Sequence, residues 1–320
     1  MMTRKLVITQ NLDEFLLTKV IEILPDWTII TGSDPSIWEP HLNDAEIIAG
    51  WKKQMEDTIL QTDINLKWLQ TWSAGVNKVP LDYFQEKKIH VTSANGVHGY
   101  PISETIFALM LSFTRKIHTY VRQQTKQTWH HANMNQELHE KTVGIIGVGH
   151  IGRETAKIAK AFGMKVLGIR NSGGQEENVD EMYTSSDLHK VLPQCDFVIV
   201  TLPLTAKTKG LFGKVEFEFM KNSSIFINIG RGAIVKETEL IEALETQQIA
   251  GAGLDVFEIE PLPKDNPLWK MENVIITPHT SGSTEHYNQR VIENIFIPNL
   301  KDYLKGKTPS VNLLNFEKGY

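Results

Sequence analysis

Three polar side chains that could carry out acid–base chemistry on an anionic substrate each follow an apolar, strand-like run in the second half of the chain. They are Arg231, Glu260 and His279. Arginine offers a permanently charged planar fork that suits a carboxylate, and an imidazole exchanges a proton near neutral pH. Because parallel strands share one carboxyl edge of a sheet, we expect these side chains to converge although they are far apart in sequence.

A glycine-rich turn precedes these residues. Gly147-x-Gly149-x-x-Gly152 follows a strand-like run and opens a helical pattern. The first glycine permits a tight turn, the second lets the backbone approach a pyrophosphate, and the third lets the helix pack on the strand. In this context the turn predicts dinucleotide binding, and the alternatives are a methyltransferase-like turn or a structural one. The expected dinucleotide contacts are Gly147, Gly149, His150, Ile151, Gly152, Arg170, Asn171, Ser172, Leu202, Pro203, Ile229 and Asp255.

The end of the next strand bears on the choice between NAD and NADP. An acidic residue usually binds the ribose 2′-hydroxyl there, but Arg170 takes that place and Asn171 and Ser172 follow it. A guanidinium and a hydroxyl suit a 2′-phosphate, so the sequence favours NADP over NAD. Glu176 and Glu177 are nearby acids, but they follow two flexible glycines, and Arg170 could also simply end the strand in solvent.

The elements that position these residues alternate between strands and helices in two blocks. The predicted strands cover residues 6–9, 27–31, 45–49, 66–71, 89–92, 143–147, 165–169, 197–202, 225–229, 253–257 and 274–277. Helical patterns cover residues 12–24, 151–162 and 236–247. Most strands in the second block are continuously apolar, as in parallel sheets covered on both faces. The pattern predicts an α/β protein with two Rossmann-like, doubly wound parallel sheets.

Two longer helical patterns link the blocks, one from Pro101 towards Tyr120 and one from near Ser283 to Leu300. The predicted domains are therefore a discontinuous, flavodoxin-like substrate domain at residues 1–98 and 287–320, and a dinucleotide-binding domain at residues 99–286. We expect a ligand cleft between them.

Several spaced motifs, taken in order, resemble the D-isomer-specific 2-hydroxyacid dehydrogenase family over essentially the whole chain. They are Ser73-Ala74-Gly75-Val76, the glycine turn, Thr201-Leu202-Pro203-Leu204-Thr205, Arg231-Gly232, Glu260-Pro261, Pro278-His279 and the closing Lys318-Gly319-Tyr320. In carrying Arg170, the chain resembles the NADPH-type glyoxylate/hydroxypyruvate reductases of that family.

The resemblance implies hydride transfer between NAD(P)H and a small 2-oxo acid or D-2-hydroxy acid. It implies that Arg231 binds the substrate carboxylate and carbonyl oxygen, that His279 is the acid/base, and that Glu260 pairs with His279. It also implies that backbone N–H groups of Ala74 and Gly75 hold the carboxylate. Trp72, which precedes that loop, is the candidate for shaping substrate choice, with ordinary core packing as the alternative.

Composition excludes several other classes. The net charge of −5 gives no basis for binding nucleic acid or an anionic membrane, and no run of about 18 apolar residues predicts a membrane span. With Cys195 as the only cysteine, no intrachain disulfide can form, which fits a reducing, cytoplasmic location. No metal-ligand spacing occurs, so we expect no metal.

A non-enzymatic, dinucleotide-sensing protein of the same fold is the alternative function, because such proteins can keep the three polar residues. The chain lacks the long disordered tail and the basic patch that would favour it. The family also implies a homodimer. The apolar helix after Pro101 is a plausible contact, unless it packs only within its own chain. The sequence leaves open which 2-oxo acid is the substrate.

Overall fold

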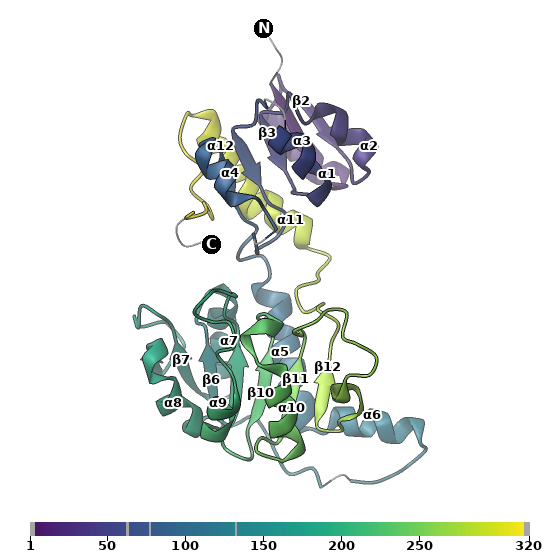
Figure 1. The fold of residues 1–320 in the computed structure, drawn as a ribbon, viewed down its shortest axis with the longest axis vertical. Helices are drawn as coiled ribbons and strands as arrows, with labels where there is room; N and C mark the ends of the chain where they lie inside the picture. The colour runs from purple at the N-terminus through teal and green to yellow at the C-terminus, as the bar shows by residue number, and fades with distance from the viewer. Residues whose placement is uncertain (1–3, 62–63, 77, 132, 317–320) are drawn as a thin grey trace. The chain divides into compact units, whose positions relative to one another are not determined.

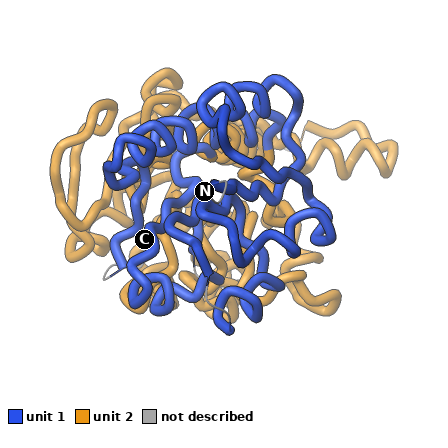
Figure 2. Tube along the Cα trace, turned by 90° about the horizontal axis from the view of Figure 1, so that it is seen from above, with its two compact units in different colours: residues 1–97, 284–320 blue, residues 98–283 orange. Residues whose placement is uncertain are grey.

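The computed structural model describes residues 4–61, 64–76, 78–131 and 133–316, and it divides into two compact units (Figures 1 and 2). Unit 1 comprises residues 1–97 and 284–320, and unit 2 comprises residues 98–283. These limits lie one to three residues from the expected domain boundaries at 98/99 and 286/287. The closing Lys318-Gly319-Tyr320 motif lies outside the described residues.

Unit 1 is built on a five-stranded parallel sheet with the order β2-β1-β3-β4-β5. Its strands are β1 (Lys5–Ile8), β2 (Thr28–Thr31), β3 (Ile47–Ala49), β4 (Trp68–Gln70) and β5 (His90–Thr92). Its helices are α1 (Glu14–Ile23), α2 (Pro35–Trp38), α3 (Glu56–Gln61), α4 (Leu81–Glu86), α11 (Tyr287–Val291) and α12 (Ile297–Leu304), with a π-helical turn at Ile292–Phe296. The strand order of this sheet is that of flavodoxin-like folds.

Both faces of this sheet are buried, which explains the apolar runs in its strands. Leu6 and Ile8 pack with α1 and α12 on one face. Val7 points to the other face, where it packs with residues of α2, α3 and α4. Alternate residues of one strand therefore serve two cores.

Unit 2 is built on a seven-stranded parallel sheet with the order β12-β11-β10-β9-β6-β7-β8. Its strands are β6 (Thr142–Ile146), β7 (Lys165–Ile169), β8 (Glu181–Tyr183), β9 (Phe197–Val200), β10 (Ile225–Asn228), β11 (Gly251–Leu254) and β12 (Val274–Ile276). Its helices are α5 (Gly99–Thr114), α6 (Ile117–Thr125), α7 (His150–Ala161), α8 (Leu188–Val191), α9 (Lys214–Phe219) and α10 (Glu237–Glu245). Strand order reverses between β6 and β9, which is where ligands bind in open α/β sheets.

Short 3₁₀ turns complete the elements of the described chain. In unit 1 they are Glu39–His41 and Lys53–Met55. In unit 2 they are Ser185–Asp187, Leu192–Gln194, Gly232–Ile234 and Pro267–Lys270.

The prediction of one long helix from Pro101 towards Tyr120 is wrong, because the chain breaks between α5 and α6. Lys116 has a left-handed backbone with φ of 55°. The Arg115 N–H still donates to the Leu111 carbonyl as α5 ends. A left-handed residue cannot continue a right-handed helix. The other predicted linking helix starts later than expected, at Tyr287.

Strands β11 and β8 also differ from the sequence-based prediction. Strand β11 ends at Leu254, although residues 253–257 were expected to form it. Its glycines let α5 lie close, since a Cβ on Gly253 would come within 3.1 Å of the Leu109 side chain, and small residues weaken the strand signal. The edge strand β8 was not predicted, because only three residues with little apolar character form it.

Candidate active site

The glycine turn joins β6 to α7, and each of its glycines meets a different requirement. Gly147 has φ of 117°, and a Cβ there would lie 2.9 Å from the Thr201 hydroxyl. A Cβ on Gly152 would lie 2.6 Å from the Gly147 carbonyl oxygen. Side chains at either position would force the turn and the helix apart.

Gly149 differs, because a Cβ there would meet no atom within 4 Å. The space beside it is open, and α7 begins directly after it at His150. Unpaired N–H groups at such a helix start attract an anion. The turn therefore fits a dinucleotide, whose pyrophosphate would fill the space that a side chain on Gly149 would take.

Further expected dinucleotide contacts follow β9, which is the neighbour of β6 in the sheet, and β10, which is the next strand beyond β9. Leu202 and Pro203 follow β9, and Ile229 follows β10 with its side chain buried. A Cβ on Gly230 would lie 2.7 Å from the Leu202 carbonyl oxygen, so the two loops are in contact. These residues thus lie at the carboxyl edge of the sheet.

His279 and Glu260 form a direct pair at the same edge. The Nδ1 atom of His279 lies 2.7 Å from Oε2 of Glu260, and both side chains are partly exposed. The other carboxylate oxygen, Oε1, accepts the N–H of Phe257 at 3.0 Å. The backbone therefore fixes the carboxylate, and the carboxylate fixes the ring. The Nε2 edge of the ring makes no hydrogen bond within the described part of the chain.

Asp255 holds the segment that carries His279. This fully buried carboxylate accepts the Thr277 hydroxyl at 2.6 Å and the N–H groups of Thr280 and Ser281 at 3.0 and 3.1 Å. The His279 N–H donates to the Asp255 carbonyl at 2.9 Å, and His279 has a left-handed backbone with φ of 53°. In this structure the Asp255 side chain is occupied with its own chain, and a dinucleotide contact there remains a prediction.

Arg231 lies in the loop after β10, half-buried, and its guanidinium donates to the Gly230 carbonyl at 2.7 Å. Asn228 shapes this loop, because its side chain accepts the Gly230 N–H and donates to the Arg231 carbonyl. A Cβ on Gly232 would lie 1.9 Å from the Phe257 backbone. The Arg231 loop is therefore packed directly against the loop that carries Glu260.

Sequence reasoning missed the supporting roles of Asn228 and Gly232. Asn228 ends a buried strand, where a fully buried amide is unusual unless it is hydrogen-bonded. A polar amide at the end of an apolar strand could therefore have indicated from the sequence that Asn228 holds the following loop.

His98 was named in neither the catalytic nor the binding set, yet it is near this edge. Its Nδ1 atom lies 3.2 Å from the Gly282 carbonyl oxygen. Burial lowers the pKa of His98, and the positive charge of Arg231 lowers it further. His98 is thus close enough to interact electrostatically with the Arg231 guanidinium.

Arg170 lies at the end of β7 as expected, and Asn171 and Ser172 follow it in an exposed turn. Its guanidinium contacts the carboxylate of Glu176 and donates to the Gly174 carbonyl at 2.9 Å. Glu176, the acidic residue that the sequence placed after the two glycines without a role, therefore pairs with Arg170.

The Trp72–Gly75 loop belongs to unit 1, and α11 holds it. The Trp72 indole N–H donates to Asn288 at 3.0 Å, and the Tyr287 hydroxyl donates to the Trp72 carbonyl at 2.8 Å. Burial raises the pKa of Tyr287 to about 12. The N–H groups of Ala74 and Gly75 donate to no acceptor among the described residues, so both can bind a ligand.

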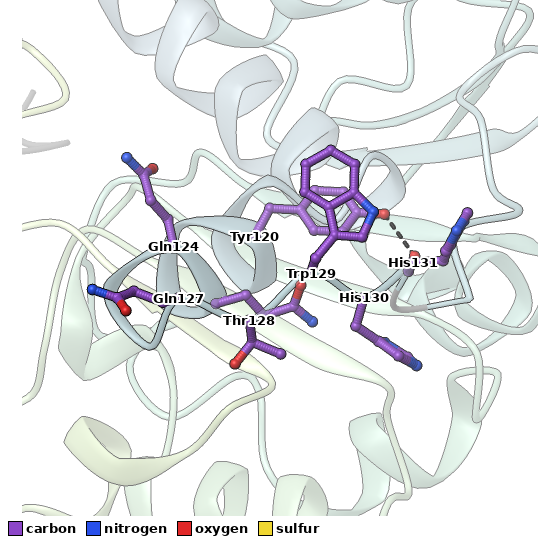
Figure 3. Close-up of a pocket in the computed structure, with 8 residues that line it drawn as sticks. Tyr120, Gln124, Gln127, Thr128, Trp129, His130 and His131 are labelled. Carbon is purple, nitrogen blue, oxygen red and sulfur yellow. Dashed lines mark hydrogen bonds between the residues drawn. The ribbon is translucent and has the colours of Figure 1, made fainter.

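A hollow of about 620 Å³ lies elsewhere in unit 2, beside α6 (Figure 3). Figure 3 shows the Tyr120 hydroxyl bonded to the His131 carbonyl, and the distance is 2.6 Å. The lining residues are Tyr120, Gln123, Gln124, Gln127, Thr128, Trp129, His130 and His131. None of them is an expected site residue.

Other kinds of site are not found in the part of the chain that the structure describes. It contains no cluster of three or more residues that could hold a metal ion, and none of its helices has the length and apolar character needed to cross a membrane. Burial raises the pKa of the Cys195 thiol to about 12, which makes it a poor nucleophile.

Comparison with known proteins identifies the family. Residues 107–281 match the NAD binding domain of D-isomer specific 2-hydroxyacid dehydrogenases. A glyoxylate/hydroxypyruvate reductase B from Salmonella schwarzengrund is 35% identical over 271 residues, which cover 83% of each chain.

Solved structures agree with this match. A D-isomer specific 2-hydroxyacid dehydrogenase family protein from Aeromonas salmonicida subsp. salmonicida is 33% identical with a TM-score of 0.86, covering 98% of this chain and 99% of that one. An NADPH-dependent glyoxylate/hydroxypyruvate reductase from Sinorhizobium meliloti, solved with NADP and sulfate, is 25% identical with a TM-score of 0.81, covering 99% of this chain and 100% of that one.

Proposed function

The chain belongs to the D-isomer specific 2-hydroxyacid dehydrogenases and is an NAD(P)-dependent oxidoreductase, and we propose that His279, Glu260 and Arg231 carry out its reaction on a small 2-oxo acid. The observation that carries this proposal is the 2.7 Å contact between His279 Nδ1 and Glu260 Oε2, beside the loop of Arg231. The sequence-based prediction of the family was correct.

When bound, a nicotinamide cofactor would supply a hydride to the carbonyl carbon of the substrate. The protonated ring of His279 then gives its Nε2 proton to the carbonyl oxygen, which becomes a hydroxyl. Glu260 accepts the Nδ1–H and so directs Nε2 outward. The Arg231 fork binds the carboxylate and polarises the neighbouring oxygen. In the oxidation direction, His279 takes the proton back.

We propose glyoxylate or hydroxypyruvate as substrates, because the relatives at 35% identity carry those names. The N–H groups of Ala74 and Gly75 would bind the substrate carboxylate. Trp72 would act by shape, since its indole N–H is already bonded to Asn288. By these roles unit 2 is the dinucleotide-binding domain and unit 1 the substrate domain.

The proposed cofactor is NADP in preference to NAD. Arg170, Asn171 and Ser172 would bind the 2′-phosphate, which needs a cation and hydrogen-bond donors. A solved relative was obtained with NADP. Gly147, Gly149, His150, Ile151 and Gly152 would hold the pyrophosphate, whereas Leu202, Pro203, Ile229 and Asp255 would border the nicotinamide half.

We also propose a homodimer, in which α6, rather than α5, would form the contact. Most of α5 is buried within its own unit, but α6 buries none of its residues. Val121 and Trp129 are exposed, the latter to 98%. Aromatic and apolar side chains of this kind are typical of interface cores. Trp129→Ser together with Val121→Asp should convert a dimer into a monomer in light scattering.

The reaction is tested by the nicotinamide absorbance, with NADPH and NADH in turn, against glyoxylate, hydroxypyruvate and bulkier 2-oxo acids. Wild type should oxidise the cofactor, and His279→Ala should lose about 10²- to 10⁴-fold in kcat. His286→Ala is a matched control, because that histidine is exposed and its ring lies beside Glu285.

Tight dinucleotide binding without turnover of any acid would overturn the catalytic proposal and favour the dinucleotide-sensing alternative. A cytoplasmic location remains a prediction from the sequence, and fractionation of the source cells would test it.

A further inference from the structure

The carboxylate of Glu176 bridges two arginines at the carboxyl end of β7. Arg153, on α7, donates from Nη2 to Oε1 at 2.6 Å and from Nε to Oε2 at 2.8 Å. Arg170 contacts the same Oε1 through Nη1. The Glu176 side chain is only 15% exposed between them, and its pKa is lowered to about 2, chiefly by Arg153 and then by Arg170.

This cluster leaves one hydrogen-bond donor unsatisfied. The Nε atom of Arg170 is buried and has no acceptor among the described residues. A buried donor without a partner costs free energy. A carboxylate has two oxygens to share between the two guanidinium groups, whereas a phosphate has three. The cluster would therefore be better satisfied by a phosphate.

The segment around Glu176 can rearrange. Gly173 has φ of 59°, and Gly174 follows it, so the loop contains two residues with high backbone freedom. Glu176 also lines a hollow of about 580 Å³, together with Gln175 and Val179. The side chain therefore has room to leave the arginines.

We propose that Glu176 determines cofactor preference by competing with the 2′-phosphate of NADP for Arg170 and Arg153. With NADP the phosphate displaces the carboxylate, whereas with NAD the carboxylate stays and balances the arginines. The enzyme then accepts both cofactors, and its preference for NADP is smaller than Arg170 alone would give. This inference rests on the proposed function, in which a dinucleotide binds along β6, α7 and β7.

Equilibrium titration tests the proposal without turnover. Binding of NADPH and NADH is measured by nicotinamide fluorescence. Binding of adenosine 2′,5′-bisphosphate and adenosine 5′-monophosphate is measured by calorimetry. The last two differ only in the 2′-phosphate. The proteins are wild type, Glu176→Gln and the matched control Glu177→Gln, which removes the same charge from an exposed neighbour.

Glu176→Gln should bind NADPH and the bisphosphate about tenfold more tightly, which corresponds to about 1.4 kcal/mol. Its affinity for NADH and the monophosphate should stay within about twofold, since neither ligand displaces the carboxylate. Glu177→Gln should resemble wild type with all four ligands. A thermal melt establishes that each variant is folded.

Three results would overturn the inference. An equal change for both ligands of a pair would mean that Glu176 does not discriminate. Weaker NADH binding alone would mean that Glu176 binds the ribose hydroxyl, and weaker NADPH binding would mean that it orders Arg170 for the phosphate. If wild type bound no dinucleotide, the proposed cofactor site itself would fall, whereas binding with an unchanged preference in Glu176→Gln would remove only this inference.

Discussion

The ends of β11 and β12 and the end of β7 hold their polar residues in different ways. At the former, Glu260 is fixed by a backbone N–H and the segment around His279 by the buried carboxylate of Asp255. At the latter, Arg170 and Arg153 are held by the side chain of Glu176 in a loop at the surface.

This difference distinguishes side chains that are held rigidly from ion pairs in which one partner can be replaced by a ligand. Groups bonded to backbone in short, packed loops keep their positions when a ligand enters, as an acid/base site requires. Ion pairs between side chains can exchange one partner for a ligand group of the same charge. We infer that the reaction type is fixed by the backbone, whereas cofactor preference is set by replaceable charge pairs.

After His279→Ala, the largest expected effect comes from Glu260→Gln at the rigid site. The amide keeps an acceptor for the Phe257 N–H but loses the negative charge beside His279. We expect kcat to fall about 10²-fold, with a changed pH–rate profile and a much smaller change in KM. Glu258→Gln is the control, because that side chain is exposed. Full activity in Glu260→Gln would remove Glu260 from the mechanism.

Asp255→Asn should chiefly affect stability. Its carboxylate accepts two backbone N–H groups and two hydroxyls, and an amide NH₂ would face some of these donors. The free energy of unfolding should fall by about 2–3 kcal/mol in urea denaturation, as for other buried, charge-assisted hydrogen bonds. Asp26→Asn, at an exposed position, should have almost no effect. Equal stability of both variants would show that the segment at 277–281 is held by other contacts.

Substitution of two glycines in the same turn should have different effects on stability. Gly149→Ala places its methyl group in open space, so the fold should be unaffected while NADPH binds about tenfold or more weakly. Gly152→Ala places its methyl group against the Gly147 carbonyl, so the melting temperature should fall as well. Thermal melts and NADPH titrations distinguish the two. Unchanged NADPH affinity in Gly149→Ala would place the pyrophosphate elsewhere.

The sequence predicts those parts of the two regions in which local residue types determine the structure. Strand β7 has the predicted bounds, and the glycine turn joins a strand to a helix as expected. His279 and Glu260 meet, because parallel strands bring successive carboxyl ends to one edge.

Other features depend on tertiary contacts that carry no local signal. The break at Lys116 occurs in an otherwise continuous helical pattern. The small residues of β11 are explained only by the close approach of α5. Glu176 looked like one acid in a flexible loop, and its place between two arginines, one of them on a different helix, appears only in three dimensions.

The smallest expected effect is the acid dependence of the exchangeable cluster. The pKa of Glu176 is lowered to about 2 in the folded protein, below the usual glutamate value of about 4.3. Its ion pairs therefore stabilise the fold above about pH 4.3, and this contribution disappears as the pH falls towards 2. Wild type should melt a few degrees higher than Glu176→Gln at pH 6, and the difference should shrink steadily below pH 4 while Glu177→Gln follows wild type throughout. A difference that persists unchanged at pH 2.5 would show that the carboxylate stabilises the loop by packing rather than by charge.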